Sequence, residues 1–495
     1  MSTPASPLPG SPGRVRVAII GAGFSGIAAG IALKKRGIDD FVIFEAADGI
    51  GGTWWKNRYP GAEVDLESHI YSFSFQHSDW SRTHAGWQEL QAYLESVVGT
   101  WGLMPHVRLR EKVQSVTWSD ADAEYTVQTS SGANDGSFTA VISAVGFLNI
   151  PLYPAFARGA NSYEGDLCHT STWREGLSMS GKSVGVVGTG SSAVQVIESA
   201  VKDAAEVKIF QLEPNWLLPK GSRDFSPLER RLNKIPPVYK WRRWRLYLDY
   251  DIRQYRSSHV RADGRSNRRR KQASIDFMHR SLASRPELLE LTTPSFPFEA
   301  RRTVVSDSYY PALLDPKVCL VPHGVKELTR TGVVDANGDE HDLDMVVLAT
   351  GFDAANYLGS YEVYGEGGIE LHDTWKSEPQ AFLGLMVPGY PNFFMMYGPN
   401  TNASPLVHFY EAQAAFAAGV ISKLGRRGRT RARLRTSAMV AYNEWLQARL
   451  QRTVWRTTDS YFKSGTGRIV SQWPFGVTSY ILATKCLRRL VVRFS

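Results

Sequence analysis

The sequence predicts an α/β protein built on two parallel-sheet folds with a helical insertion. Two glycine-rich turns support this prediction, because each follows an apolar strand and begins a helix. The length of 495 residues supports it as well, since one hydrophobic core stops growing at well below that size. A helical pattern over residues 222–295 indicates the insertion.

The first fold begins at residues 14–20, which alternate and then become fully apolar, as in a buried parallel strand. The turn Gly21-Ala22-Gly23-Phe24-Ser25-Gly26 follows, then a helix, and then a strand from Phe41 to Phe44. In such a Rossmann-like fold the glycines permit a tight turn, make room for a diphosphate and let helix and strand pack closely. Glu45, at the next strand end, suits the hydroxyls of an adenosine ribose. The candidate binding residues are Gly21, Gly23, Phe24, Ser25, Gly26 and Glu45.

A second unit of the same kind begins with a strand at Ser183–Val187 and has its next strand at Val207–Phe210. Between them, Ala193 replaces the third glycine, which is a tolerated change. The candidate binding residues are Gly188, Thr189, Gly190, Ser191 and Ser192. Glu213 would favour NADH by repelling a 2′-phosphate, whereas a basic residue from elsewhere would favour NADPH. The sequence leaves this choice open.

These patterns divide the chain into four parts. We expect a disordered leader at 1–13, the first part of one dinucleotide-binding domain at 14–150, a second dinucleotide-binding domain at 151–334 that includes the 222–295 insertion, and a return to the first domain at 335–495. Apolar strands that end on glycine turns, near 144–147 and 344–352, are predicted to carry the chain between the domains.

Composition indicates a cytoplasmic protein. No run approaches the roughly 18 apolar residues of a membrane-spanning helix, and the leader lacks the apolar core of a signal peptide. The three cysteines, Cys168, Cys319 and Cys486, are scattered and imply neither a disulfide framework nor a zinc site. We therefore expect no bound metal.

The net charge of +9 belongs to one segment. Residues 220–280 hold 18 Lys and Arg against 6 Asp and Glu, a surplus larger than the net charge of the whole chain. Such a segment could meet cofactor phosphates, a membrane or nucleic acid, but we favour a solvated helical insertion and expect no nucleic-acid partner.

Two further motifs carry a family resemblance. Gly51-Gly52-Thr53-Trp54 is followed by Tyr59-Pro60-Gly61 and Asp65, and a second stretch reads Tyr163-x-Gly165-x-x-x-His169-x-x-x-Trp173. Together they resemble the class B flavoprotein monooxygenases, most closely the type I Baeyer–Villiger enzymes. The chain departs from the fingerprint at Tyr163, usually Phe, and at Arg174, usually Pro or Asp.

The resemblance implies FAD on the first fold and NADP(H) on the second. It adds Gly52, Thr53 and Trp54 to the cofactor-binding residues. Of the fingerprint residues Gly165, His169 and Trp173, it gives His169 a role in domain linkage and cofactor positioning. Arg302, after Thr293–Phe298, matches the catalytic arginine that stabilises a flavin peroxide, and Asp65 would orient it. Arg301 stands where a Lys usually touches the 2′-phosphate, and Tyr461 stands where a Trp often lies near the nicotinamide.

We therefore expect an oxidoreductase that uses NAD(P)H and O₂ to insert oxygen next to the carbonyl of a ketone. We expect this ketone to be lipophilic. An alternative is a flavin monooxygenase that oxygenates sulfur or nitrogen and depends less on Arg302. A third possibility is a cofactor-binding redox sensor without turnover. The regiochemistry and the oligomeric state are not encoded in any pattern of the sequence.

Overall fold

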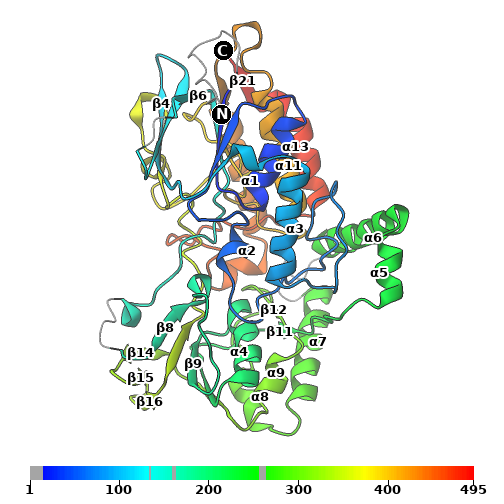
Figure 1. The fold of residues 1–495 in the computed structure, drawn as a ribbon, viewed down its shortest axis with the longest axis vertical. Coiled ribbons are helices and arrows are strands. Elements are labelled where there is room, and N and C mark those ends of the chain that lie inside the picture. Colours follow the sequence, from blue (N-terminus) through cyan, green and yellow to red (C-terminus); the bar gives the residue numbers. More distant parts are fainter. Residues whose placement is uncertain (1–14, 133–134, 159–162, 256–263) are drawn as a thin grey trace, which may run out of the picture.

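The computed structural model describes residues 15–132, 135–158, 163–255 and 264–495. It contains two five-stranded parallel sheets, one in each half of the molecule (Figure 1). The predicted α/β class with two Rossmann-like units is therefore confirmed. The expected leader at 1–13 lies outside the described residues.

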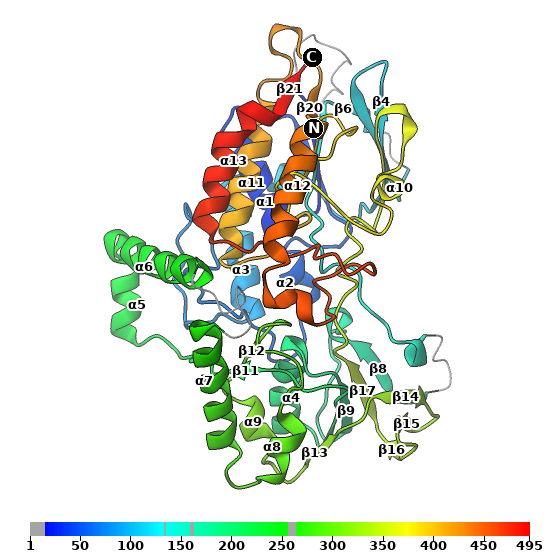
Figure 2. The same cartoon turned by 180° about the vertical axis from the view of Figure 1, so that it is seen from behind.

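The first sheet has the strand order β19-β7-β1-β2-β3, and all its pairings are parallel. Helix α1 follows β1 and packs against α11, which in turn contacts α13 (Figure 2). A four-stranded sheet, β18-β4-β5-β6, adjoins this unit. The bounds are β1 Val17–Ile20, β2 Phe41–Phe44, β3 Val107–Arg108, β4 Val113–Ser119, β5 Glu124–Thr129, β6 Ser137–Phe138, β7 Ala140–Ser143, β18 Glu362–Tyr364, β19 Phe393–Met395, α1 Phe24–Lys34, α2 Thr53–Lys56, α3 Trp87–Thr100, α10 Leu371–Trp375, α11 Leu406–Ile421, α12 Thr436–Leu450 and α13 Val477–Val491.

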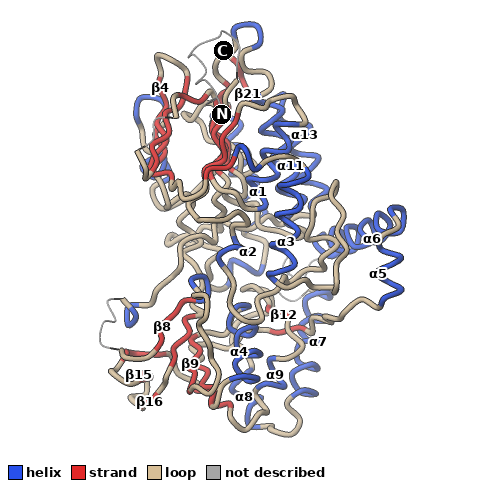
Figure 3. The backbone as a smooth tube through the Cα atoms, viewed as in Figure 1, coloured by secondary structure: helices blue, strands red, loops and turns tan. Residues whose placement is uncertain are grey.

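The second sheet has the order β13-β10-β9-β17-β8 and is also parallel throughout. Strands of the two units form separate groups in the backbone trace (Figure 3). The bounds are β8 Asp166–His169, β9 Ser183–Val187, β10 Glu206–Phe210, β11 Leu217–Leu218, β12 Val304–Val305, β13 Val318–Val321, β14 Val325–Leu328, β15 Gly332–Asp335, β16 Glu340–Asp342, β17 Met345–Leu348, α4 Ser191–Asp203, α5 Pro227–Asn233, α6 Pro236–Tyr255, α7 Arg265–Ser281, α8 Glu287–Thr292 and α9 Tyr309–Ala312. The paired strands β20 Ala432–Leu434 and β21 Val492–Phe494 instead lie beside the first unit, where β20 hydrogen-bonds Asn392.

The chain crosses between the two sheets twice, and the two crossings touch. Leu152 N donates to Gly351 O at 2.9 Å, and Thr350 Oγ1 donates to Leu152 O at 2.6 Å. Strand β17 pairs with β8 and β9, so the second sheet continues past the boundary expected at residue 335. The apolar pattern of β17 would suit either sheet, and pairing decides its place. The domain division otherwise stays a prediction.

The helices of the 222–295 region contact both units. Helix α7 packs on β11 and α9 of the second unit. Helix α6 instead inserts the buried Arg243 into the first unit, where Arg243 Nη1 donates to His69 O at 2.5 Å and Nη2 contacts His408 Nε2 at 3.1 Å. Because this guanidinium faces an imidazole nitrogen, His408 must be neutral to accept the hydrogen bond.

Acid should therefore destabilise the first unit. Burial lowers the pKa of His69 to about 3 and that of His84 to about 4, and it also lowers the pKa of His408 well below its usual value. The unfolded chain takes up these protons near pH 6.5 and the folded chain does not, so stability is lost as pH falls below 6.5. At pH 5 we expect a loss of about 2 kcal/mol for each of His69 and His84.

Urea unfolding at pH 7.5 and pH 5.0 tests this expectation, with the midpoint lower at pH 5.0. His408→Gln keeps an acceptor for Arg243 but has no proton to gain, so its midpoint should depend less on pH. Equal midpoints for the unmodified protein at both pH values would contradict the argument.

Among the described residues, no helix combines the length and the apolar character needed to span a bilayer.

Candidate active site

The first glycine turn is packed so closely that its glycines are required. A β-carbon at Gly26 would lie 1.9 Å from the Gly21 carbonyl oxygen, and one at Gly21 would lie 2.8 Å from Ala144 O. Gly52 comes from the later motif, yet its β-carbon would lie 2.9 Å from the Gly23 α-carbon. The Gly51-Gly52-Thr53 segment thus lies directly on the glycine turn, and the two motifs form one structure.

A cavity of about 480 Å³ opens in front of this turn. This volume is within the usual range for ligand sites. Among the predicted residues, the turn contributes Gly21, Gly23, Phe24 and Ser25, strand β2 leads to Glu45, and the later motif contributes Gly52 and Thr53. Gly26 and the buried Trp54 are not part of the lining; Trp54 packs edge-on against Tyr71, with ring centroids 5.8 Å apart.

The Glu45 carboxylate is held in place by two backbone donors. Its side chain accepts hydrogen bonds from Ala22 N at 2.7 Å and Ala47 N at 2.9 Å, one on each carboxylate oxygen. Each oxygen therefore keeps a further lone pair toward the cavity. A glycine cradle at the N-terminus of α1 together with this carboxylate fits the diphosphate and ribose of FAD.

The second glycine turn repeats the geometry of the first. A β-carbon at Gly188 would lie 2.7 Å from Ala349 O, which follows β17 as Ala144 follows β7. Thr189 Oγ1 donates to the Glu213 carbonyl at 2.8 Å, and Gly190 precedes the first residue of α4, Ser191. This turn fits a dinucleotide diphosphate at the N-terminus of α4.

The Tyr59–Asp65 segment joins the two turns. Tyr59 Oη donates to Gln195 Oε1 at 2.7 Å, and a β-carbon at Gly61 would lie 2.5 Å from Gln195 O. This contact with α4 brings Asp65 to the N-terminus of that helix, where Ser191 Oγ donates to Asp65 Oδ2 at 3.3 Å.

Arg302 meets Asp65 at this junction. Its Nη2 donates to Asp65 Oδ2 at 2.7 Å, and 48% of its side chain is exposed, so the guanidinium can face a bound molecule. Burial by the surrounding protein lowers the pKa of Arg302, but the charge of Asp65 outweighs it and the pKa is raised above its usual value. Arg302 is thus a permanent cation.

Tyrosines connect Arg302 with the cavity. Tyr71 lines the cavity, and burial raises its pKa to about 12, with the charges of Asp65 and Arg302 close enough to act on it. Burial raises the pKa of Tyr461 and of Tyr397, and the nearby charge of Arg302 opposes the shift at both hydroxyls. The site therefore places one fixed cation among aromatic hydroxyls, one of which, that of Tyr71, belongs to a residue in the cavity wall.

The fingerprint residues lie near the segments where the chain crosses between the two sheets, and they do not line the cavity. His169 is fully buried; its Nδ1 accepts from Ser171 N at 3.1 Å and its Nε2 faces Gly351 O at 3.0 Å. A β-carbon at Gly165 would lie 2.7 Å from Asp344 O, and Trp173 packs on the second core. Burial lowers the pKa of His169, which keeps its ring neutral.

The two departures from the fingerprint have partners in the structure. Tyr163 Oη donates to Leu343 O at 2.8 Å, so the extra hydroxyl is satisfied inside the fold. Arg174 Nη2 pairs with Asp166 at 3.1 Å.

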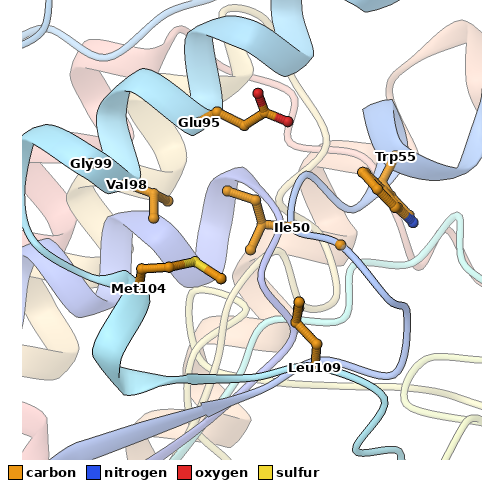
Figure 4. A pocket seen from close by; sticks show the side chains of 8 residues that line it. Ile50, Trp55, Glu95, Val98, Gly99, Met104 and Leu109 are labelled. Carbon is orange, nitrogen blue, oxygen red and sulfur yellow. The ribbon is translucent and has the colours of Figure 1, made fainter.

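A second, smaller cavity of about 300 Å³ lies between α3 and the segment that begins at Gly49 (Figure 4). Its lining is mostly apolar and includes no predicted site residue. The predicted cofactor-binding residues that line a cavity therefore all lie at the larger one.

Much of the lining of the larger cavity was not predicted from the sequence. Lys56 and Lys112 lie there, and Lys56 Nζ donates to Asn149 Oδ1 at 2.7 Å. Three further segments complete the wall: Ala144–Gly146, Leu148–Pro151 and Gly359–Tyr361. The glycines at 146 and 359 were a weak sign that the chain turns close to a ligand there. Only the pairing of distant strands brings these segments together.

Comparison with known proteins adds to this geometry. A family model described as pyridine nucleotide-disulphide oxidoreductase matches residues 18–236, which span both glycine turns, although Cys168, Cys319 and Cys486 are free thiols. A Baeyer–Villiger monooxygenase of Pseudomonas aeruginosa is 33% identical over 481 residues, covering 96% of this chain and 90% of that protein. The chain belongs to the Baeyer–Villiger monooxygenase family.

Solved structures agree with this assignment. An oxidized steroid monooxygenase bound to NADP is 28% identical with a TM-score of 0.87, covering 97% of this chain and 99% of that one. The OTEMO complex with FAD and NADP is 25% identical with a TM-score of 0.87, covering 98% and 100%. This Baeyer–Villiger-type protein is thus a flavin monooxygenase whose cofactors are FAD and NADP(H), and the predicted family, enzyme class and cofactors are confirmed.

Proposed function

We propose that the chain oxidises a lipophilic ketone to an ester or lactone, with O₂ supplying the inserted atom and NAD(P)H supplying two electrons. The second oxygen atom leaves as water. The observation that carries this proposal is the Arg302–Asp65 pair, 2.7 Å long, whose charges act on Tyr71 in the wall of a cavity that fits FAD. The bound flavin would supply the activated oxygen.

The residues divide the work among them. Gly21, Gly23 and Ser25 would hold the FAD diphosphate at the N-terminus of α1, and Glu45 would accept from its ribose. Gly26 keeps α1 close to the turn. In the second fold, residues 188–192 would cradle the nicotinamide dinucleotide in the same way.

Arg302 would stabilise negative charge that develops on oxygen near the flavin. A guanidinium suits this task because it stays charged and does not give up its proton. Asp65 holds one side of that guanidinium, so the remaining N–H donors are free to point at the reacting atoms.

A lipophilic substrate fits the aromatic character of the site. Three tyrosines near Arg302 are buried or half-buried: Tyr71, Tyr397 and Tyr461. Their side chains present mainly aromatic ring surface. Ring faces of this kind pack well on alicyclic or aryl groups. Relatives of this chain include steroid and cyclohexanone monooxygenases.

The test is a substrate screen with the purified, FAD-loaded protein. Cyclic, aryl and steroidal ketones are incubated with NADPH or NADH under air, and products are identified by mass. We expect products heavier by one oxygen atom and coenzyme oxidation that depends on the ketone. Oxygenation of sulfides or amines without any ketone product would favour the heteroatom alternative, and a colourless protein that refuses FAD would contradict both.

Asp65→Asn probes the orienting role of the carboxylate. The amide keeps the size and one acceptor but loses the charge that fixes Arg302, so we expect ketone turnover to fall by about tenfold to a hundredfold. FAD content should stay unchanged, because Asp65 does not line the cavity. Steady-state kinetics beside the flavin spectrum measure both quantities; unchanged turnover would remove Asp65 from the mechanism.

A further inference from the structure

Glu213 lies beside the second glycine turn, three residues past the end of β10. Its carbonyl oxygen accepts from Thr189 Oγ1 at 2.8 Å, and Asn215 Nδ2 donates to Thr189 O at 2.9 Å. The loop after β10 is therefore tied to the turn that would cradle the nicotinamide dinucleotide. In folds of this type the end of this strand meets the adenosine ribose, the part of the molecule that distinguishes NADPH from NADH.

The Glu213 carboxylate already holds the cation expected to bind a 2′-phosphate. Arg301 Nη1 donates to Glu213 Oε2 at 2.5 Å, and Ser295 Oγ donates to Oε1 at 3.0 Å. Arg301 is held further, since its Nε donates to Asp459 O at 3.1 Å and its guanidinium lies 4.6 Å from the Phe296 ring centroid. The charge of Arg301 is thus neutralised inside the protein.

The residue before Glu213 cannot replace Arg301 as a binding partner for a 2′-phosphate. Leu212 is 87% exposed and has no hydrogen-bond donor on its side chain. A 2′-phosphate carries between one and two negative charges near pH 7, so it would face Glu213 as a like charge and would have to compete with it for Arg301. A free 2′-hydroxyl, in contrast, can donate to the carboxylate.

We propose that Glu213 makes the second nucleotide fold of this chain accept the dinucleotide without a 2′-phosphate, so that NADH binds at least as tightly as NADPH. The inference rests on the proposed function, because it assigns the second fold to the nicotinamide coenzyme. It deepens that function by naming the residue that sets coenzyme preference.

Isothermal titration of the oxidised, FAD-loaded full-length protein with NAD⁺ and with NADP⁺ tests the proposal without any turnover. We expect the Kd for NAD⁺ to be equal to or below that for NADP⁺. Glu213→Gln should tighten NADP⁺ binding by about tenfold, because it removes the like charge and frees Arg301, while NAD⁺ binding changes by less than about threefold. Glu206→Gln, at the other end of the same strand, is the matched control and should change neither Kd.

The double variant Glu213→Gln with Arg301→Ala should lose the gain in NADP⁺ affinity, because the freed cation is gone. NADP⁺ binding more than about tenfold tighter than NAD⁺ in the unmodified protein would overturn the inference and leave the proposed function standing. Failure of both nucleotides to bind the FAD-loaded protein would overturn the two together. The ratio in the unmodified protein decides the matter even if Glu213→Gln does not fold.

Discussion

Replacing Arg302 by alanine is expected to lower ketone turnover by about a hundredfold to a thousandfold, the usual cost of removing a donor that stabilises charge in a transition state. The fold should survive, since about half of the side chain is exposed and its ion pair is with one partner, Asp65. Ester or lactone formation per unit time, measured by product mass, gives the turnover, and the flavin spectrum reports cofactor content.

Two further variants sharpen this test. Arg302→Lys keeps the charge but loses the planar fork, so it should restore only part of the turnover. Arg330→Ala removes an arginine from an exposed ion pair with Glu164 and should leave turnover unchanged. Full ketone oxidation by Arg302→Ala would show that the cation has no part in the reaction, and persistent sulfide oxidation beside lost ketone oxidation would separate the two chemistries.

Gly26→Ala should give the second large effect, the loss of FAD. The added β-carbon would lie 1.9 Å from the Gly21 carbonyl oxygen, so α1 or the turn must move. We expect a destabilisation of about 3 kcal/mol or more, with most of the purified protein free of flavin. The ratio of flavin to protein absorbance measures the loss.

Gly99→Ala is the matched control for this substitution. Gly99 is exposed near the end of α3 and has no heavy atom within 4 Å of the added carbon. Alanine there should hold FAD normally and stabilise the helix slightly. A yellow, fully loaded Gly26→Ala protein would mean that the turn tolerates a helix displaced from its strand.

Local patterns predicted the two nucleotide units well. Strands β2 and β9 have the bounds expected from their apolar runs, because a short apolar run between polar residues or a glycine turn leaves a buried parallel strand few alternatives. Residues that touch the turns through near neighbours, such as Glu45 and Ser191, were found for the same reason. The place of β17 was not, since its register is set by β8 and β9 rather than by its own residues.

Long-range pairs were accessible only through family resemblance. Asp65 and Arg302 are 237 positions apart, and no periodicity links them. The pairing of Glu213 with Arg301 could not be predicted either: the sequence offered a carboxylate and a cation as opposing signals for coenzyme choice, and their mutual contact appears only when the loop after β10 meets the segment after Phe298. The effect of these two charges on coenzyme choice therefore depends on how the tertiary structure pairs them.

The touching crossings at Leu152 and Gly351 have a consequence for engineering. A segment that enters and leaves a host at one point behaves as an exchangeable cassette, since its removal leaves two ends already in contact. Residues 152–351 of this protein could be transplanted as one piece into a relative. We expect the transplanted segment to bring its own coenzyme preference. The contacts to preserve in such a chimera are those of Arg243 with His69 and His408, of Gln195 with Tyr59 and of Arg302 with Asp65.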